Sequence, residues 1–235
     1  MGETEASSFN GGLSGAAECG DAASFVLPTS SSRSLETADI LSQQGGVDIL
    51  GYVSREQLDQ FNGKPVLGDD GELPRLLSGH PGLGAIVAIG EPRTRERLFI
   101  RLAELGFEML SAIHPRSSVA ASARLGRGVT INAGAVVNAR AVIDDGAIIN
   151  TNASVSHEAE VGAFSNISPG AAVGGRVKIG KRCWIGIGAS IIQGVTLGDD
   201  AIDAIIGAGA AVVRSLPASV TAAGVPCRVL KERAP

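Results

Sequence analysis

Residues 131–178 read INAGAV VNARAV IDDGAI INTNAS VSHEAE VGAFSN ISPGAA VGGRVK, and every block of six begins with Ile or Val. The same spacing runs without a miss through fourteen positions, from Val119 to Leu197. The residue four places after each of these is small in every case: nine Ala, three Val, Ser165 and Cys183. An α-helix has about 3.6 residues per turn and does not give this period. An alternating strand would bury three residues per hexad. The pattern predicts a β-helix of hexapeptide repeats, with three hexads per coil.

The corners of the coils and one irregularity follow from the same register. The residue directly after the large aliphatic is Gly, Asn or Asp in ten of fourteen hexads, and these types tolerate a positive φ best. After Leu197 the next aliphatic-Gly pair is Ile206-Gly207, nine residues on. Removing Asp203-Ala204-Ile205 restores the period up to Val212. These three residues read as an insertion, either a plain surface loop or a loop that shapes an acceptor site.

Composition limits the classes of protein to consider. A chain of 235 residues supports one large or two modest domains, and 3% aromatics with 32 Gly suit a narrow solenoid core. The net charge of −4 gives no reason to expect nucleic acid, and no apolar run is long enough for a membrane span. Three cysteines without motif spacing and a start that lacks a basic, apolar leader favour a cytoplasmic protein.

The N-terminal half has a different pattern. We expect disorder over 1–24, a Rossmann-like α/β domain over 25–113, the β-helix over 114–215 and a C-terminal tail over 216–235. The domain assignment rests on alternating strands and helices: strands at 25–27, 47–53, 85–89 and 107–113, and helices at 35–41 and 92–105. Ligands in such sheets bind beyond the carboxyl ends of the strands, which points to Gly90. The helix that starts at Pro92 could hold a phosphate with Arg93 and Arg95, unless these arginines form a solvated face.

A family resemblance runs over about residues 25–231. It is carried by His114-Pro115 at the entry to the coils and by four further stretches: Ile149-Asn150-Thr151, Val155-Ser156-His157-Glu158, 174–180 and 224–228. These resemble the sugar O-acyltransferases of the sialic-acid O-acetyltransferase type and the bacterial N-acetyltransferases of UDP-linked 4-amino sugars. The resemblance implies a left-handed β-helix, acetyl-CoA as co-substrate, no metal, and a homotrimer with its active sites between neighbouring β-helices.

The resemblance also implies roles for particular residues. His157 would be the general base, with Glu158 orienting it. The CoA groove would be lined by Asn166, Gly175, Ile187 and Ala208, and a nucleotide-linked sugar acceptor would contact Ser31, Ser32, Arg33, Ser54 and Gly90. Three departures stand out. Asn166 lies where some relatives carry a second His, the stretch 29–33 lacks the glycines of the family's nucleotide loop, and Ser54 lies where relatives place acidic residues.

The chemistry expected from these residues is direct acyl transfer, in which His157 removes a proton from the attacking amine or hydroxyl. The backbone N–H of Gly175 could stabilise the oxyanion. Two basic clusters are either CoA-phosphate ligands or solvated faces: Lys178, Lys181 and Arg182, and Arg228, Lys231 and Arg233.

Other functions remain open. One is an acyltransferase acting on a non-sugar acceptor, and another is a catalytically silent scaffold. A zinc enzyme on the same coils would need three histidine ligands, and the chain has His80, His114 and His157, of which one lies well within the coils.

Overall fold

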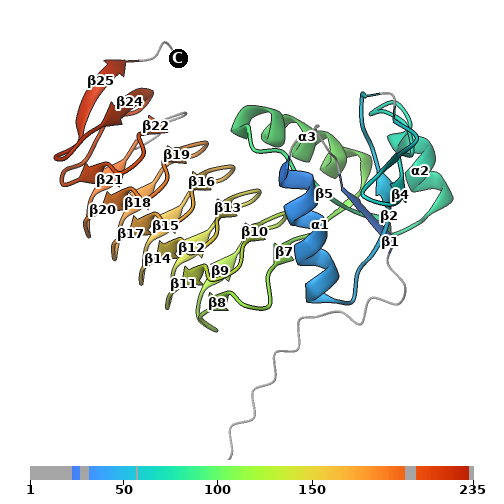
Figure 1. Cartoon of the computed structure of the whole chain (residues 1–235), viewed down its shortest axis with the longest axis horizontal. Coiled ribbons are helices and arrows are strands. Elements are labelled where there is room, and N and C mark those ends of the chain that lie inside the picture. The colour runs from blue at the N-terminus through green and yellow to red at the C-terminus, as the bar shows by residue number, and fades with distance from the viewer. Residues whose placement is uncertain (1–22, 27–31, 57, 199–204, 233–235) are drawn as a thin grey trace, which may run out of the picture.

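The computed structural model describes residues 23–26, 32–56, 58–198 and 205–232. Figure 1 shows an α/β domain at one end, followed by a stack of coils that runs to the C-terminal strands. The two predicted architectures, a Rossmann-like domain and a hexapeptide β-helix, are confirmed. The expected disorder over 1–24 falls almost entirely outside the described residues; Ala23 and Ser24 already belong to the first strand.

The α/β domain is built on a four-stranded parallel sheet in the order β2-β1-β5-β6. Its strands are β1 (Ala23–Val26), β2 (Asp48–Tyr52), β5 (Gly84–Ile86) and β6 (Glu108–Met109). Its helices are α1 (Ser32–Gln44), α2 (Leu73–Gly79) and α3 (Pro92–Leu105). Sequence reasoning missed α2 and the small hairpin of β3 (Gln60–Phe61) and β4 (Lys64–Pro65).

The solenoid has three faces, each a sheet in which neighbouring strands come from successive coils. The eight-strand face holds β7 (Ala112–Ile113), β10 (Thr130–Ile131), β13 (Ile148–Ile149), β16 (Asn166–Ile167), β19 (Trp184–Ile185), β22 (Ile205–Ile206), β24 (Val220–Ala223) and β25 (Arg228–Glu232). The six-strand face holds β8 (Ser118–Val119), β11 (Val136–Val137), β14 (Ser154–Val155), β17 (Ala172–Val173), β20 (Ser190–Ile191) and β23 (Ala211–Val212). The five-strand face holds β9 (Arg124–Leu125), β12 (Val142–Ile143), β15 (Glu160–Val161), β18 (Lys178–Ile179) and β21 (Thr196–Leu197).

Stacking follows the predicted register. As far as Leu197, each large aliphatic pairs with its counterpart eighteen residues on, as Ile131 does with Ile149 and Val155 with Val173. The small residues fill the space beside them, and Ala153, Ala159 and Cys183 are fully buried. Because each coil is covered mainly by its neighbours, the stability of the solenoid resides in these stacked interfaces.

The position of the positive φ angles differs from the prediction. Most lie three residues after the large aliphatic, as at Gly134, Gly146 and Glu158, and not directly after it. The residue directly after is often Gly for a different reason. A Cβ at Gly162 or Gly174 would come within about 2.6 Å of backbone atoms of the next coil. At these two glycines, close packing between coils, and not backbone handedness, excludes a side chain.

The ends of the predicted segments also need correction. Ile205 is not part of an insertion, because it pairs with Trp184 in the eight-strand face; Asp203 and Ala204 lie outside the described residues. The stretch 107–113 is two strands, and the second, β7, already belongs to the solenoid. Residues 216–235 are more than a tail: β24 continues the eight-strand face and β25 pairs with it in antiparallel fashion.

A buried arginine joins the two domains. Arg95 of α3 is 1% exposed, and its guanidinium donates to the carbonyl oxygens of Ile89 and Gly90 in its own domain. It also donates to the carbonyl oxygens of Gly146 and Phe164 at a corner of the solenoid. Burial and the nearby positive charge of Arg33 lower the pKa of Arg95 to about 9, which leaves it a cation at neutral pH.

Candidate functional site

His157 lies at the corner where the chain passes from β14 on the six-strand face to β15 on the five-strand face. It comes two residues after the inward-pointing Val155 and beyond the end of β14, so it is not confined to the inward face of that strand. The side chain is 56% exposed, which places the imidazole outside the prism core. It is therefore accessible to a ligand on the outer wall of the coils.

Glu158 holds one side of the imidazole. His157 Nδ1 lies 3.2 Å from Glu158 Oε2, and Arg140 Nη2 donates to Glu158 Oε1 at 2.7 Å. Arg176 Nη1 is 3.9 Å from Oε2. The hydrogen bond from His157, followed by the charge of Arg140, lowers the pKa of the Glu158 carboxyl group. With Nδ1–H donated to an ionised carboxylate, Nε2 of His157 is left as the hydrogen-bond acceptor.

Gly175 lies beside Nε2 of that imidazole, one coil further on. A Cβ built at Gly175 would be 2.7 Å from His157 Nε2 and 2.8 Å from Cε1. The Gly175 carbonyl accepts from Gly194 N, while the described part of the structure gives its own N–H no partner. This corner therefore brings together the imidazole of His157 and the backbone of Gly175.

The other three residues predicted for the CoA groove form a second group. Asn166, Ile187 and Ala208 line a hollow of about 510 Å³ that also reaches Arg33 and Glu36 of α1. Asn166 is 1% exposed, and its Oδ1 has no hydrogen-bond partner. Ile187 is 63% exposed, so a large apolar side chain stands open at the rim of the hollow.

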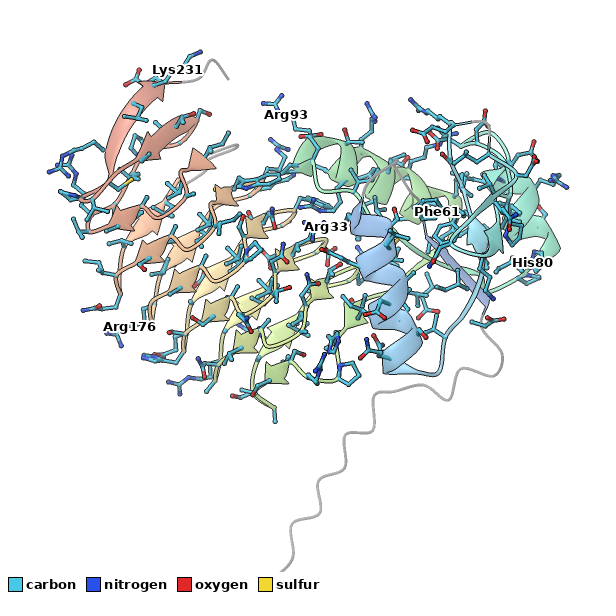
Figure 2. The ribbon with its side chains drawn as sticks, in the orientation of Figure 1. Arg33, Phe61, His80, Arg93, Arg176 and Lys231 are labelled. Carbon is cyan, nitrogen blue, oxygen red and sulfur yellow. The ribbon has the colours of Figure 1, made fainter. Side chains whose placement is uncertain are left out.

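The two groups lie at different edges of the prism. Ile187 and Ala208 follow β19 and β22 at the corner between the eight-strand and six-strand faces, whereas His157 and Gly175 are at the next corner. In Figure 2, Arg33 lies between α1 and the coils, while Arg176, which neighbours Glu158, is on the outer side. One copy of the chain does not bring all the predicted site residues together.

The residues predicted to contact the nucleotide are only partly placed. Ser31 lies outside the described residues, Ser32 is the first residue of α1, and Arg33 faces the hollow, with Nη1 3.3 Å from Glu36. Ser54 is 7% exposed, and its Oγ accepts from Glu56 N in a local turn. Gly90 offers open space in front of its Cα, and its carbonyl is taken by Arg95.

The start of α3 does not provide the anion site suggested by the sequence. The side chain of Glu91 caps this helix and accepts from the backbone N–H groups of Arg93 and Thr94. A carboxylate therefore already occupies the positive end of the helix. Arg95 is buried in the domain joint and cannot reach a phosphate in solvent.

The basic clusters also separate into different roles. Lys181 and Arg182 both form ion pairs with Glu96 of α3, so they hold the α/β domain against the coils and do not form a CoA-phosphate site. Lys178 pairs with Glu160 at 3.5 Å. Arg228 and Lys231 are exposed on the C-terminal hairpin, and Arg233 lies outside the described residues.

The two remaining histidines do not form a metal site with His157. His80 caps the end of α2, and His114 is buried with its Nδ1 accepting from Arg116 N. Within the described ranges, no three His, Cys, Asp or Glu side chains are grouped as a metal site would require. No helix in the same part of the chain combines the length and apolar character needed to cross a bilayer.

This chain is similar to proteins of known structure and to a known domain family. Residues 34–102 match the family model described as PglD N-terminal domain. The crystal structure of PerB from Caulobacter crescentus, in complex with CoA and GDP-perosamine, is 38% identical, with a TM-score of 0.81 over 89% of this chain and 97% of that one. The chain belongs to the hexapeptide-repeat sugar acetyltransferases. The acetyltransferase domain of PglB from Neisseria gonorrhoeae, in complex with acetyl coenzyme A, is 33% identical, with a TM-score of 0.83 over 90% of this sugar acetyltransferase and 100% of that domain.

Curated relatives match over a shorter stretch. Galactoside O-acetyltransferase from Escherichia coli is 48% identical over 56 residues, which are 24% of this sugar acetyltransferase and 26% of that protein. The chain therefore aligns with about a quarter of the length of this relative.

Sequence reasoning missed three residues at the two groups. Arg140 and Arg176 contact Glu158 from the coils on either side, and Glu36 pairs with Arg33 beside the hollow. The signal for the arginines was available, because each is eighteen residues, or one coil, from Glu158. No sequence signal identifies Glu36, since its place depends on how α1 packs against the solenoid.

Proposed function

We propose that this protein transfers the acetyl group of acetyl-CoA to an amino group of a nucleotide-linked sugar, with His157 as general base. The observation that carries the proposal is the exposed imidazole of His157, which contacts Glu158 through Nδ1 and has its Nε2 beside the backbone of Gly175. The named ligands of PerB, CoA and GDP-perosamine, support this class of donor and acceptor. An amine acceptor is favoured over a hydroxyl because a further PerB structure names perosamine N-acetyltransferase.

The mechanism follows from the corner geometry. The acceptor amine attacks the thioester carbonyl while His157 Nε2 takes its proton, and Glu158 stabilises the imidazolium that forms. The unpaired N–H of Gly175, beside the ring, donates to the oxyanion of the tetrahedral intermediate. Collapse of the intermediate breaks the C–S bond, and the CoA thiolate takes a proton, which His157 can return.

The complete site requires a second copy of the chain. The His157 corner and the hollow lined by Asn166, Ile187 and Ala208 lie at different edges of one prism. Rotation about a threefold axis parallel to the long axis of the prism would place the His157 corner of each copy against the hollow of its neighbour. We therefore propose a homotrimer in which acetyl-CoA lies in the groove between two copies, against the hollow of one copy and with its thioester at the His157 corner of the other.

The test is the kinetics of His157→Ala with acetyl-CoA and a panel of GDP-, UDP- and dTDP-linked amino sugars, measured by thiol release. Loss of the general base should lower kcat by at least about a hundredfold while the fold is retained. The matched control is His80→Ala, since His80 is an exposed histidine at the end of α2. Near-normal turnover of the His157 variant would contradict the assignment.

A second outcome would favour the silent scaffold. If the unaltered chain releases no thiol with any acceptor of the panel, the altered nucleotide loop at 29–33 would be the first place to look for the reason.

A further inference from the structure

Three charged residues line one corner of three successive coils. Arg140, Glu158 and Arg176 occupy the third place after the large aliphatic, each eighteen residues from the next, and their φ angles are 58°, 59° and 56°. Glycine fills the equivalent place at many other corners: Gly128, Gly134, Gly146, Gly170, Gly188 and Gly194.

A left-handed backbone is costly for residues that carry a Cβ, by about 1 kcal/mol or more each. Two other non-glycine residues with this conformation, Phe164 and Arg182, make contacts with the α/β domain through Phe99 and Glu96. At these two corners the strained residue carries a side chain with a defined contact, while Asn152, a further case, is of a type that tolerates this conformation. The run of Arg140, Glu158 and Arg176 indicates that this corner, too, retains its side chains for what they touch.

The two oxygens of Glu158 are divided between two partners. Arg140 Nη2 donates to Oε1 at 2.7 Å, while Oε2 lies 3.2 Å from His157 Nδ1. Arg176 is 3.9 Å from Oε2, beyond hydrogen-bonding distance. Arg140 therefore fixes the rotation of the carboxylate, and through it the direction of the imidazole.

The contact between Arg140 and Glu158 is exposed, with 71% of the arginine side chain and 35% of the glutamate side chain open to solvent. Exposed ion pairs of this kind stabilise a fold by little, about 0–1 kcal/mol. Removing Arg140 should therefore leave thermal stability nearly unchanged. If the arginine has a role, that role should be seen in catalysis.

We propose that Arg140 is a positioning residue for the transfer reaction: it holds Glu158 so that Glu158 orients His157, and it does so from the coil before the catalytic corner. The proposal rests on the proposed function, because it requires His157 to be the base. Arg176 contributes charge to the same carboxylate from the coil after it, without fixing its rotation.

The test is a double-mutant cycle that combines Arg140→Met with Glu158→Gln, and includes Arg140→Lys and Arg176→Met. Arg140→Met should lower kcat by about tenfold, the low end of what loss of an outer partner costs at metal sites, with both KM values unchanged. Lysine should restore part of the activity, and Arg176→Met should have a smaller effect than Arg140→Met. In the Glu158→Gln background, Arg140→Met should have no further effect, because its path to His157 is already broken.

The pH profile gives a readout that a structural role would not move. The groups facing Glu158 are Arg140 from the preceding coil, Arg176 from the following coil and His157 beside it. Without the positive charge of Arg140 the carboxylate of Glu158 is less compensated, which favours an added proton on the His157–Glu158 pair, so the acid-side fall of kcat/KM should begin at a higher pH. The Arg75→Met control, at an exposed ion pair on α2, should leave the profile unchanged.

The outcomes separate this proposal from the proposed function. If His157→Ala is inactive but Arg140→Met matches the unaltered protein in kcat and pH profile, the positioning role is wrong and the general base stands. If His157→Ala stays active, the general base itself is wrong. Equal losses from Arg140→Met in both backgrounds would show that the arginine acts by another route and would overturn the proposal.

Discussion

Replacing Gly175 by alanine separates catalysis from folding at the His157 corner. The new Cβ would lie 2.7 Å from His157 Nε2 and 2.8 Å from Cε1. Ordinary contact begins near 3.4 Å, so the ring must retreat by about 0.7 Å. Because Gly175 does not have a positive φ and the atoms it would meet belong to an exposed side chain, the ring can move without disturbing the coil.

The expected effect on activity follows from that displacement. Misplacing a reacting group by about 1 Å can cost about a hundredfold in rate, so we expect kcat to fall by about tenfold or more. The melting temperature should be unchanged or slightly higher, since Gly→Ala at a compatible position removes freedom from the unfolded chain. The assay is thiol release from acetyl-CoA, run beside thermal unfolding of the same preparation.

Two glycine variants serve as controls for Gly175→Ala. At Gly174 the new Cβ would meet backbone atoms of the next coil at 2.6–2.9 Å, which cannot give way, so Gly174→Ala should destabilise the fold by about 1–3 kcal/mol. At Gly79 of α2 it would meet nothing within 4 Å, so Gly79→Ala should leave kcat unchanged and the melting temperature unchanged or slightly higher. Unaltered kcat in Gly175→Ala, or a loss of activity accompanied by unfolding, would refute this account of the ring's position.

Two further predictions concern the domain joint and the assembly. Burial raises the pKa of the Glu96 carboxyl group, but hydrogen bonds from Lys181 and Arg182 outweigh this effect, so the pKa is lowered. The charged carboxylate therefore stabilises the folded protein fully above the ordinary carboxyl pKa, and this stabilisation is lost as pH falls through the lowered pKa. Glu96→Gln should therefore destabilise the protein by about 2 kcal/mol at pH 7, and the difference in melting temperature should shrink in acid; an equal difference at both pH values would contradict this. Sedimentation should give three chains per particle. Mixing the inactive variants His157→Ala and Ile187→Arg should restore part of the activity, because some interfaces then combine an unaltered His157 of one copy with an unaltered Ile187 of the other. An active monomer would contradict the shared site.

Much of the fold could be predicted because the solenoid repeats its own local rule. The spacing from Val119 to Leu197 fixes which residues face inward, and the structure follows it strand by strand. The positive φ angles were misplaced because a preference for Gly has two physical causes, handedness and close packing, which composition alone does not separate. Ile205 was misassigned because the spacing of nine residues from Leu197 to Ile206 shows that three residues are added but not which three they are.

The candidate site was predictable where its members lie in one coil or in adjacent coils. His157, Glu158 and Gly175 come together through the repeat itself. Contacts across domains left no such trace. Arg95 and Lys181 contact the other domain only because of how α3 packs against the solenoid. Basic residues in a sequence look alike whether they bind a neighbouring domain or a phosphate, so the sequence does not distinguish these two roles.

The hydrogen bonds of Arg95 to the solenoid have a consequence for hybrid proteins that combine domains from different relatives. On the solenoid side its guanidinium meets the main-chain oxygens of Gly146 and Phe164, which every residue type supplies. A β-helix of different sequence but the same corner geometry would accept this arginine equally well. The α/β domains of relatives could therefore be exchanged as long as the incoming domain brings its own arginine, with acidic partners such as Glu96 needing adjustment to the new surface.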